Sequence, residues 1–142
     1  MSVRAEVLNI LERVFRQHGF ASLLLRKANI SKEEMGLSSE IVYGTIRNKT
    51  LLEEQWRPFT KHVKPRVSAL LNMSVYQLFF LDSIASYAVI FEAVELAGKS
   101  EKAFVNAVLR MVQKQGLKKP VGNTMEELAV LTSHPLWILQ LW

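Results

Sequence analysis

The amino-acid sequence predicts an all-α fold, a compact bundle of helices. Apolar residues recur at the 3.6-residue period of amphipathic helices in several successive stretches. Strand-like alternation and hairpin signals such as Asn-Gly are absent. The chain has 142 residues, 49% of them hydrophobic and 22% charged, which is enough material for one ordinary domain with a sizeable core. These observations favour a helical bundle over a sheet protein or a disordered chain.

The first helix is predicted to begin near Val3 and to end at Gly19, because glycine releases the backbone from the helical conformation. A short second helix is predicted over 21–27. The apolar residues that follow the helical period on one face of the first helix are Val3, Val7, Ile10, Leu11 and Val14.

A capping box predicts the start of the third helix. Ser31 and Glu34 have the S-x-x-E spacing, in which the two side chains satisfy two unpaired backbone N–H groups. The helix is expected to reach about Asn48, and Gly36 is a point where it could be broken. Gly44 within this helix costs about 1 kcal/mol relative to alanine. We therefore interpret Gly44 as the point of a close contact between two helices.

Further helices are predicted in the second half of the chain. A helix over 51–59 is ended by Pro58. Pro65 suits the first turn of the next helix, because its missing N–H would have no partner there. That helix is apolar on more than one side, which predicts a central position. The last two predicted helices are 86–98, with Ser86 as cap, and 100–115, with Ser100 as cap.

The chain is predicted to divide at about residue 115. Residues 1–115 form the helical domain, and residues 116–142 form a linker and the start of a connection to a further domain absent from this chain. The stretch 116–123 is a linker by composition. Thr124 and Glu127 form a second capping box. The last residues are aliphatic with two tryptophans, so we expect them to dock either on the bundle itself or on a following domain.

The composition excludes several classes of function. Without cysteine, the chain has no disulfide, thiolate metal site or cysteine nucleophile, and its three histidines are far apart in sequence. No glycine-rich nucleotide loop is present. We therefore predict no catalytic residue and no metal ligand. A signal peptide and an apolar stretch of about 20 residues are also absent, which predicts a cytoplasmic protein without a membrane partner.

The net charge of +5 indicates a polyanionic partner, and the basic excess is concentrated in two regions. Residues 1–30 and 101–120 each contain five lysines and arginines, against two glutamates and one. In the second region every fourth residue forms a polar ridge along the predicted helix, composed of Lys102, Asn106, Arg110 and Lys114. The apolar side of the same helix is assigned to Phe104, Ala107, Val108, Met111 and Gln115.

The ridge suits an RNA backbone, because its cations can bind phosphates and its amide can reach a base edge. The alternative is a solvated helix face. Arg4 is a second candidate, since a cation in the first helical turn opposes the macrodipole unless an anion binds there. Arg47 and Lys49 complete the candidate set, although their position at the end of a helix is by itself favourable to cations.

Four segments resemble one family of helical domains. They are F-V-N-A-V-L-R at 104–110, E-I-V-Y-G-T-I-R at 40–47, E-A-V-E-L-A at 92–97 and S-H-P-L-W at 133–137. The chain is similar to the NusB-like domain, in the version found at the N-terminus of the RsmB/Sun (Fmu) ribosomal RNA cytosine-C5 methyltransferases. It departs from that pattern at three positions: Ala103 replaces a glycine, Ser86 a proline and Phe91 an asparagine. Phe91 removes a polar group, so we assign it no RNA contact.

The resemblance implies a NusB-like bundle that binds small-subunit ribosomal RNA. In such enzymes a separate Rossmann-like domain binds S-adenosylmethionine and supplies the nucleophilic cysteine. This chain contains neither feature, so the resemblance implies an RNA-presenting module whose partners are the RNA and its own C-terminal methyltransferase domain. Two alternatives stay open: a NusB-type transcription antitermination factor, against which Arg110 in place of an acidic residue argues, and a helical protein-interaction module.

Overall fold

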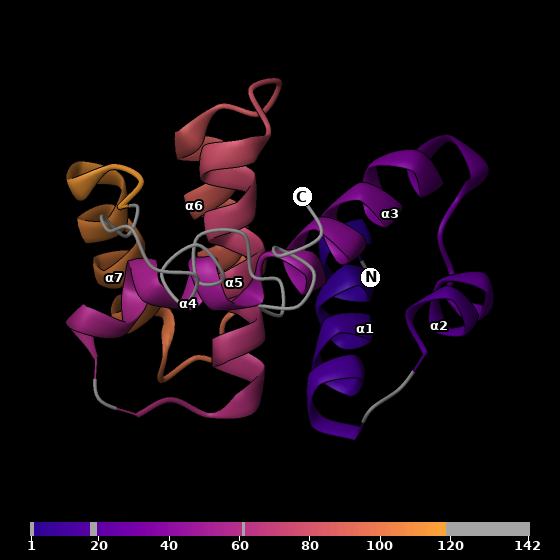
Figure 1. The fold of residues 1–142 in the computed structure, drawn as a ribbon, viewed down its shortest axis with the longest axis horizontal. Helices are drawn as coiled ribbons and strands as arrows, with labels where there is room; N and C mark the ends of the chain where they lie inside the picture. The colour runs from indigo at the N-terminus through magenta and orange to yellow at the C-terminus, as the bar shows by residue number, and fades with distance from the viewer. Residues whose placement is uncertain (1, 18–19, 61, 119–142) are drawn as a thin grey trace, which may run out of the picture.

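The computed structural model describes residues 2–17, 20–60 and 62–118, and the regular elements in these ranges are all helical (Figure 1). This confirms the predicted all-α class. In chain order the elements are α1 (Val3–Gln17), α2 (Ala21–Lys27), α3 (Lys32–Arg47), α4 (Lys49–Trp56), a 3₁₀ turn (Arg57–Phe59), α5 (Pro65–Phe80), α6 (Ser86–Leu96) and α7 (Lys102–Gln115).

Helix α5 is the centre of the bundle, as its apolar character predicts. It contacts α1, α3, α4, α6 and α7, and ten of its sixteen residues are buried. Figure 1 shows α1, α2 and α3 on one side of α5, with α6 and α7 on the other. The buried Asn72 Oδ1 accepts a hydrogen bond of 2.7 Å from Trp56 Nε1, which joins α5 to α4. Pro65 occupies the first turn, where its missing N–H costs nothing.

Gly44 allows α3 to lie close to α5, as expected. A Cβ atom at residue 44 would overlap the ring of Tyr76, which is 8% exposed and stacks on Phe80 with ring centroids 5.1 Å apart. Gly36, in contrast, is exposed and has open space around it. Helix α3 continues through Gly36 without a break, because an exposed glycine weakens a helix without ending it.

The reciprocal hydrogen bonds of the predicted capping box do not form at the start of α3. Ser31 is the N-cap, but its hydroxyl donates a hydrogen bond of 2.8 Å to Glu34 Oε1. The Glu34 N–H bonds the Ser31 backbone carbonyl at 3.1 Å. The carboxylate, a charged acceptor, therefore takes the hydroxyl proton, and the Ser31 side chain accepts no bond from the helix backbone.

The predictions that Ser86 and Ser100 cap the last two helices are wrong. Ala85 is the N-cap of α6, its carbonyl accepts bonds from the first turn, and Ser86 is already helical. Before α7, the N–H of Glu101 bonds the carbonyl of Gly98 at 2.7 Å. This turn moves the start of α7 beyond Ser100 and makes Glu101 the N-cap.

Several predicted helix ends shift by a few residues. Helix α1 ends at Gln17, and Gly19 lies outside the described residues. Helix α4 begins at Lys49, two residues before the predicted start, and Pro58 lies in the 3₁₀ turn that follows it. Helix α6 ends at Leu96, two residues before the predicted end, whereas α7 ends at Gln115 as predicted.

The segment after α7 turns away from the helix and is held against α4. Gly116 has a φ of 79°, a left-handed conformation that favours glycine. The buried Gln55 then forms two hydrogen bonds with Lys118: its Nε2 donates to the Lys118 carbonyl at 2.7 Å, and its Oε1 accepts from the Lys118 N–H at 2.6 Å. The second capping box, most of the predicted linker and the tryptophan-rich segment lie outside the described residues.

Candidate nucleic-acid interface

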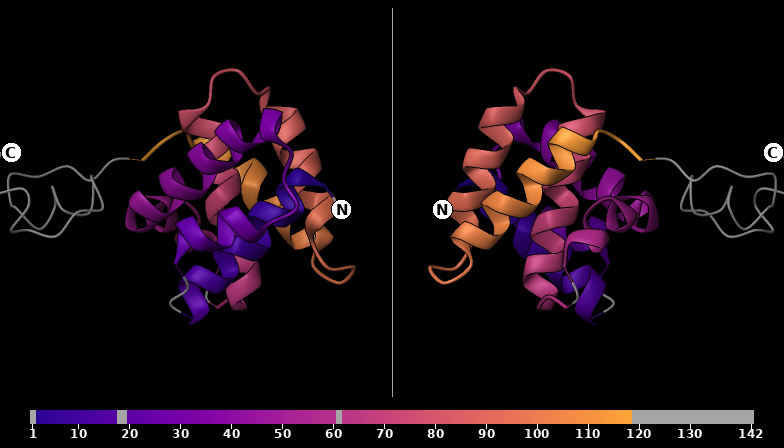
Figure 2. Two further views of the ribbon diagram at one scale, coloured as in Figure 1. Left: turned by 90° about the vertical axis from the view of Figure 1, so that its right-hand side faces the viewer. Right: turned by 90° about the vertical axis from the view of Figure 1, so that its left-hand side faces the viewer.

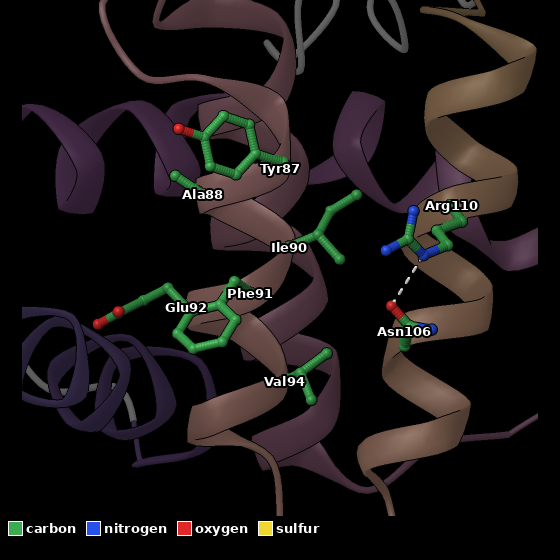
Figure 3. A pocket seen from close by; sticks show the side chains of 8 residues that line it. All are labelled: Tyr87, Ala88, Ile90, Phe91, Glu92, Val94, Asn106 and Arg110. Atoms are coloured by element: carbon green, nitrogen blue, oxygen red, sulfur yellow. Dashed lines mark hydrogen bonds between the residues drawn. The ribbon is translucent and has the colours of Figure 1, made fainter.

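Arg110 and Asn106 lie together on α7, at the edge of a hollow between α6 and α7 (Figure 3). Arg110 Nε donates a hydrogen bond of 3.0 Å to Asn106 Oδ1, one helical turn earlier. Within the described part of the chain, the two terminal guanidinium nitrogens form no hydrogen bond. Figure 3 shows them directed toward α6. The ridge therefore contains an oriented arginine whose charged end is available to an anion.

The hollow beside Arg110 has a volume of about 540 Å³. Helix α6 supplies an apolar floor and two exposed aromatic side chains, and α7 supplies the polar wall formed by Asn106 and Arg110. Tyr87 is 79% exposed and Phe91 is 65% exposed. The α6 side chains in question are Tyr87, Ile90, Phe91 and Val94.

Arg4 lies on the other flank of α6. Its Nε donates a hydrogen bond of 2.9 Å to Oε1 of Gln77, a buried residue in the last turn of α5. Arg4 lines a smaller hollow of about 180 Å³, which shares Ala88 and Glu92 with the hollow beside Arg110. The structure thus places Arg4 and Arg110 on opposite sides of one helix, although 106 residues separate them in sequence.

Lys102 and Lys114, the two lysines of the ridge, have different environments. Lys102 Nζ donates to the backbone carbonyls of Val94 at 2.8 Å and Glu95 at 3.4 Å. These carbonyls belong to the last turn of α6, where a cation is favourable to the helix dipole. Lys102 therefore joins α7 to α6. Lys114 is exposed in the last turn of α7.

Lys49 belongs to a different part of the surface. Its Nζ lies 3.0 Å from Glu53 Oε2 and 5.5 Å from the ring centroid of Phe15. Phe15 and Arg4 are eleven residues apart on α1, about 16 Å along the helix axis. Lys49 is also the first residue of α4. It directly follows Asn48, the C-cap of α3, and it shares the Glu53 carboxylate with Arg57, whose guanidinium lies 2.9 Å from Oε1.

Arg47 is exposed in the last turn of α3, where it is favourable to the helix dipole as expected. It lies close enough to Tyr76 to affect that hydroxyl. Burial raises the pKa of Tyr76, Glu40 raises it further, and Arg47 partly offsets both effects. The candidate residues thus divide into an α1/α6/α7 group and the Arg47–Lys49 pair.

The predicted apolar side of α7 is partly wrong. Ala107 and Met111 are exposed, the latter by 50%. The face that packs into the core is rotated around the helix and consists of Val105, Val108, Leu109 and Val112. These positions follow the i, i+3, i+4, i+7 spacing of one helix face. The rotation brings Lys102 to the border of the buried face and leaves Arg110 and Lys114 farther from it.

Sequence reasoning did not single out Tyr87, and it assigned Phe91 no RNA contact because a phenylalanine replaces a polar group there. Their four-residue spacing was a usable signal, because it places them on one face of a helix. Val89, Ile90 and Ala93 form the buried side of α6, so the two aromatic rings are not needed for the core. Within the described residues there is no group of three or more potential metal ligands, and no helix is long and apolar enough to cross a membrane.

Comparison with known proteins identifies relatives. The profile of the NusB family matches residues 1–114. A probable ribosomal RNA small subunit methyltransferase B of Bacillus subtilis is 38% identical over 154 aligned positions, which cover 99% of this chain and 34% of that protein. A protein of the same description from a Synechocystis species is 27% identical, over 100% of this chain and 35% of the relative. The chain thus spans about a third of the length of these relatives, and it belongs to the NusB family.

Proposed function

We propose that this chain is the RNA-binding domain of a ribosomal RNA (cytosine-C5) methyltransferase. It would position small-subunit ribosomal RNA for a C-terminal catalytic domain. The names of the relatives support this proposal, as does the third of their length that the chain spans. Residues 1–115 would form the RNA-binding domain, residues 116–142 would lead into the catalytic domain, and the protein would act in the cytoplasm.

The catalytic chemistry belongs to the rest of such an enzyme. The present sequence contains no cysteine and no glycine-rich nucleotide loop. The nucleophile and the residues that bind S-adenosylmethionine would therefore come from the C-terminal domain. The contribution of this chain to the reaction is to bind and orient RNA, which supplies affinity and register.

The observation that carries the proposal is the placement of two arginines on either side of α6. Gln77 holds the Arg4 side chain and Asn106 holds that of Arg110, each through Nε. Because one hydrogen bond already orients each guanidinium, less conformational freedom is lost when a phosphate binds. Two fixed cations across one helix suit two phosphates of the same strand.

We assign the principal RNA contacts to Arg4, Asn106, Arg110 and Lys114. Lys102 would act indirectly, because its ammonium group already bonds the end of α6. Lys49 is paired with Glu53 and would add little to the binding of a phosphate. Arg47 is exposed and would contact only an RNA that extends beyond the α1/α6/α7 surface.

The test is a fluorescence titration of the 142-residue chain with small-subunit ribosomal RNA fragments across a series of salt concentrations. Arg4→Gln and Arg110→Gln are each expected to weaken binding about tenfold. Each should also reduce the slope of log K against log salt by about 0.7–0.9, the value for one lost phosphate contact.

Arg26→Gln is the matched control. Arg26 is exposed on α2, which lies across α5 from α6 and α7, and its loss changes the net charge equally (Figure 2). We expect a much smaller effect from this control. If Arg26→Gln weakens binding as much as Arg110→Gln, the assigned surface is wrong. If the unaltered chain binds no fragment at low salt, the proposed function is wrong.

A further inference from the structure

Two exposed aromatic rings of α6 line the same hollow as the oriented arginine. Tyr87 and Phe91 are one helical turn apart on α6 and are 79% and 65% exposed. In Figure 3 both rings stand on α6 and are directed away from Arg110, and the Ile90 and Val94 side chains lie between the rings and α7. The buried residues of α6 are Val89, Ile90 and Ala93. The two exposed rings therefore do not contribute to the hydrophobic core of the bundle.

We propose that Tyr87 and Phe91 form a stacking surface for unpaired RNA bases, while Arg110 binds the adjoining phosphate. This proposal rests on the RNA-binding function proposed above and specifies the structural class of RNA that the domain accepts. Aromatic side chains stack on the faces of bases, which are accessible when the bases are unpaired. An RNA duplex keeps those faces stacked inside the helix.

The spacing of the two rings favours unstacked nucleotides. Residues four apart on a helix are separated by about 6 Å along its axis. Stacked bases follow one another at about 3.4 Å. Two consecutive bases can therefore reach Tyr87 and Phe91 only when the strand is opened so that their faces separate.

The charges around the hollow agree with a nucleic acid as the occupant. The terminal nitrogens of Arg110 point into the hollow, while the Glu92 carboxylate points away from Arg110 (Figure 3). The backbone of a strand would therefore pass on the α7 side of the rings, where Lys114 lies one turn beyond Arg110. The floor between the rings and Arg110 is the apolar surface of Ile90 and Val94, which suits the flat faces of bases.

The experiment compares the full chain with Tyr87→Ala and Phe91→Ala. The probes are a single-stranded oligoribonucleotide of about ten nucleotides, with 2-aminopurine at successive positions, and a duplex of the same sequence. We expect the unaltered chain to prefer the single strand and to change the fluorescence of the base that it stacks. Each alanine variant should weaken single-strand binding about 5- to 150-fold.

The salt dependence of the affinity distinguishes stacking from phosphate binding. The alanine variants should keep the salt slope of the unaltered chain, because stacking releases no counterions, whereas Arg110→Gln should lower it. Tyr87→Phe and Phe91→Tyr keep a ring and should bind like the unaltered chain. Tyr43→Ala is the matched control, because Tyr43 is 40% exposed on α3, across α5 from the hollow.

Four outcomes would overturn the proposal. Equal affinity for single strand and duplex contradicts recognition of unpaired bases. Unchanged RNA binding by both alanine variants, combined with weaker binding by Arg110→Gln, leaves the RNA-binding function standing but refutes the stacking surface. Loss of binding to a separately supplied methyltransferase domain by Phe91→Ala, with RNA affinity unchanged, assigns the rings to a protein interface instead. If the unaltered chain binds ribosomal RNA fragments but neither short probe, the stacking surface is refuted while the RNA-binding function stands.

Discussion

Gly44→Ala is the substitution whose effect the packing of α3 on α5 most clearly determines. The added Cβ would overlap Cζ, Oη and Cε1 of Tyr76. These atoms are at the far end of a side chain that is 8% exposed and stacked on Phe80, so the ring cannot move aside without disturbing its neighbour. Overpacking of this kind costs about 1–3 kcal/mol of the free energy of unfolding.

Gly36→Ala isolates the gain in helix propensity, which opposes the cost of the overlap at residue 44. Both glycines lie inside α3, and replacing either by alanine gains about 1 kcal/mol of helix propensity. A Cβ at residue 36 meets no atom within 4 Å, so this variant should show the gain alone. The difference in stability between the two variants therefore measures the overlap with Tyr76, and we expect about 1–3 kcal/mol, with Gly44→Ala the less stable.

Urea unfolding followed by circular dichroism measures this difference, provided that the m-values of the variants agree. Tyr76→Leu supplies a second background, because leucine lacks the three overlapping ring atoms. In that background Gly44→Ala should become as favourable as Gly36→Ala, which would complete a double-mutant cycle. If Gly44→Ala stabilises the unaltered chain as much as Gly36→Ala does, the close contact between α3 and α5 is not a constraint and our reasoning is refuted.

Two further predictions concern single side chains. Lys102→Met should lower the free energy of unfolding by about 0.5–1.5 kcal/mol, because two carbonyls of α6 lose a partner. The same urea titration measures this loss. The RNA affinity of Lys102→Met should fall less than that of Arg110→Gln. The second concerns Tyr76, whose pKa is raised in the folded chain, mainly by burial, above the usual 10.0. The unfolded chain therefore loses this proton first, so stability should fall as pH rises above about 10, and Tyr76→Phe should reduce that fall in urea titrations from pH 8 to 11.

The helices could be predicted from the sequence because their signals are local. The 3.6-residue period and the position of Pro65 depend only on neighbouring residues, and both are confirmed. The caps were less predictable, because a serine hydroxyl can bond either the helix backbone or a nearby carboxylate, as Ser31 does with Glu34. The buried face of α7 was also mis-assigned, since Met111 is apolar but lies outside the contact with the core.

The availability of a cation depends on contacts that a sequence pattern does not contain. Lys102 and Arg110 share one ridge, yet the ammonium group of Lys102 bonds the end of α6, while the terminal nitrogens of Arg110 bond no other described residue. Lys49 is likewise paired with Glu53, one turn away on its own helix. Arg4 joins the candidate surface only because α1 and α7 pack on the same central helix, with α6 beside both. An equal spacing of charges therefore predicts candidates, and the packing of neighbouring helices determines which of them can bind a phosphate.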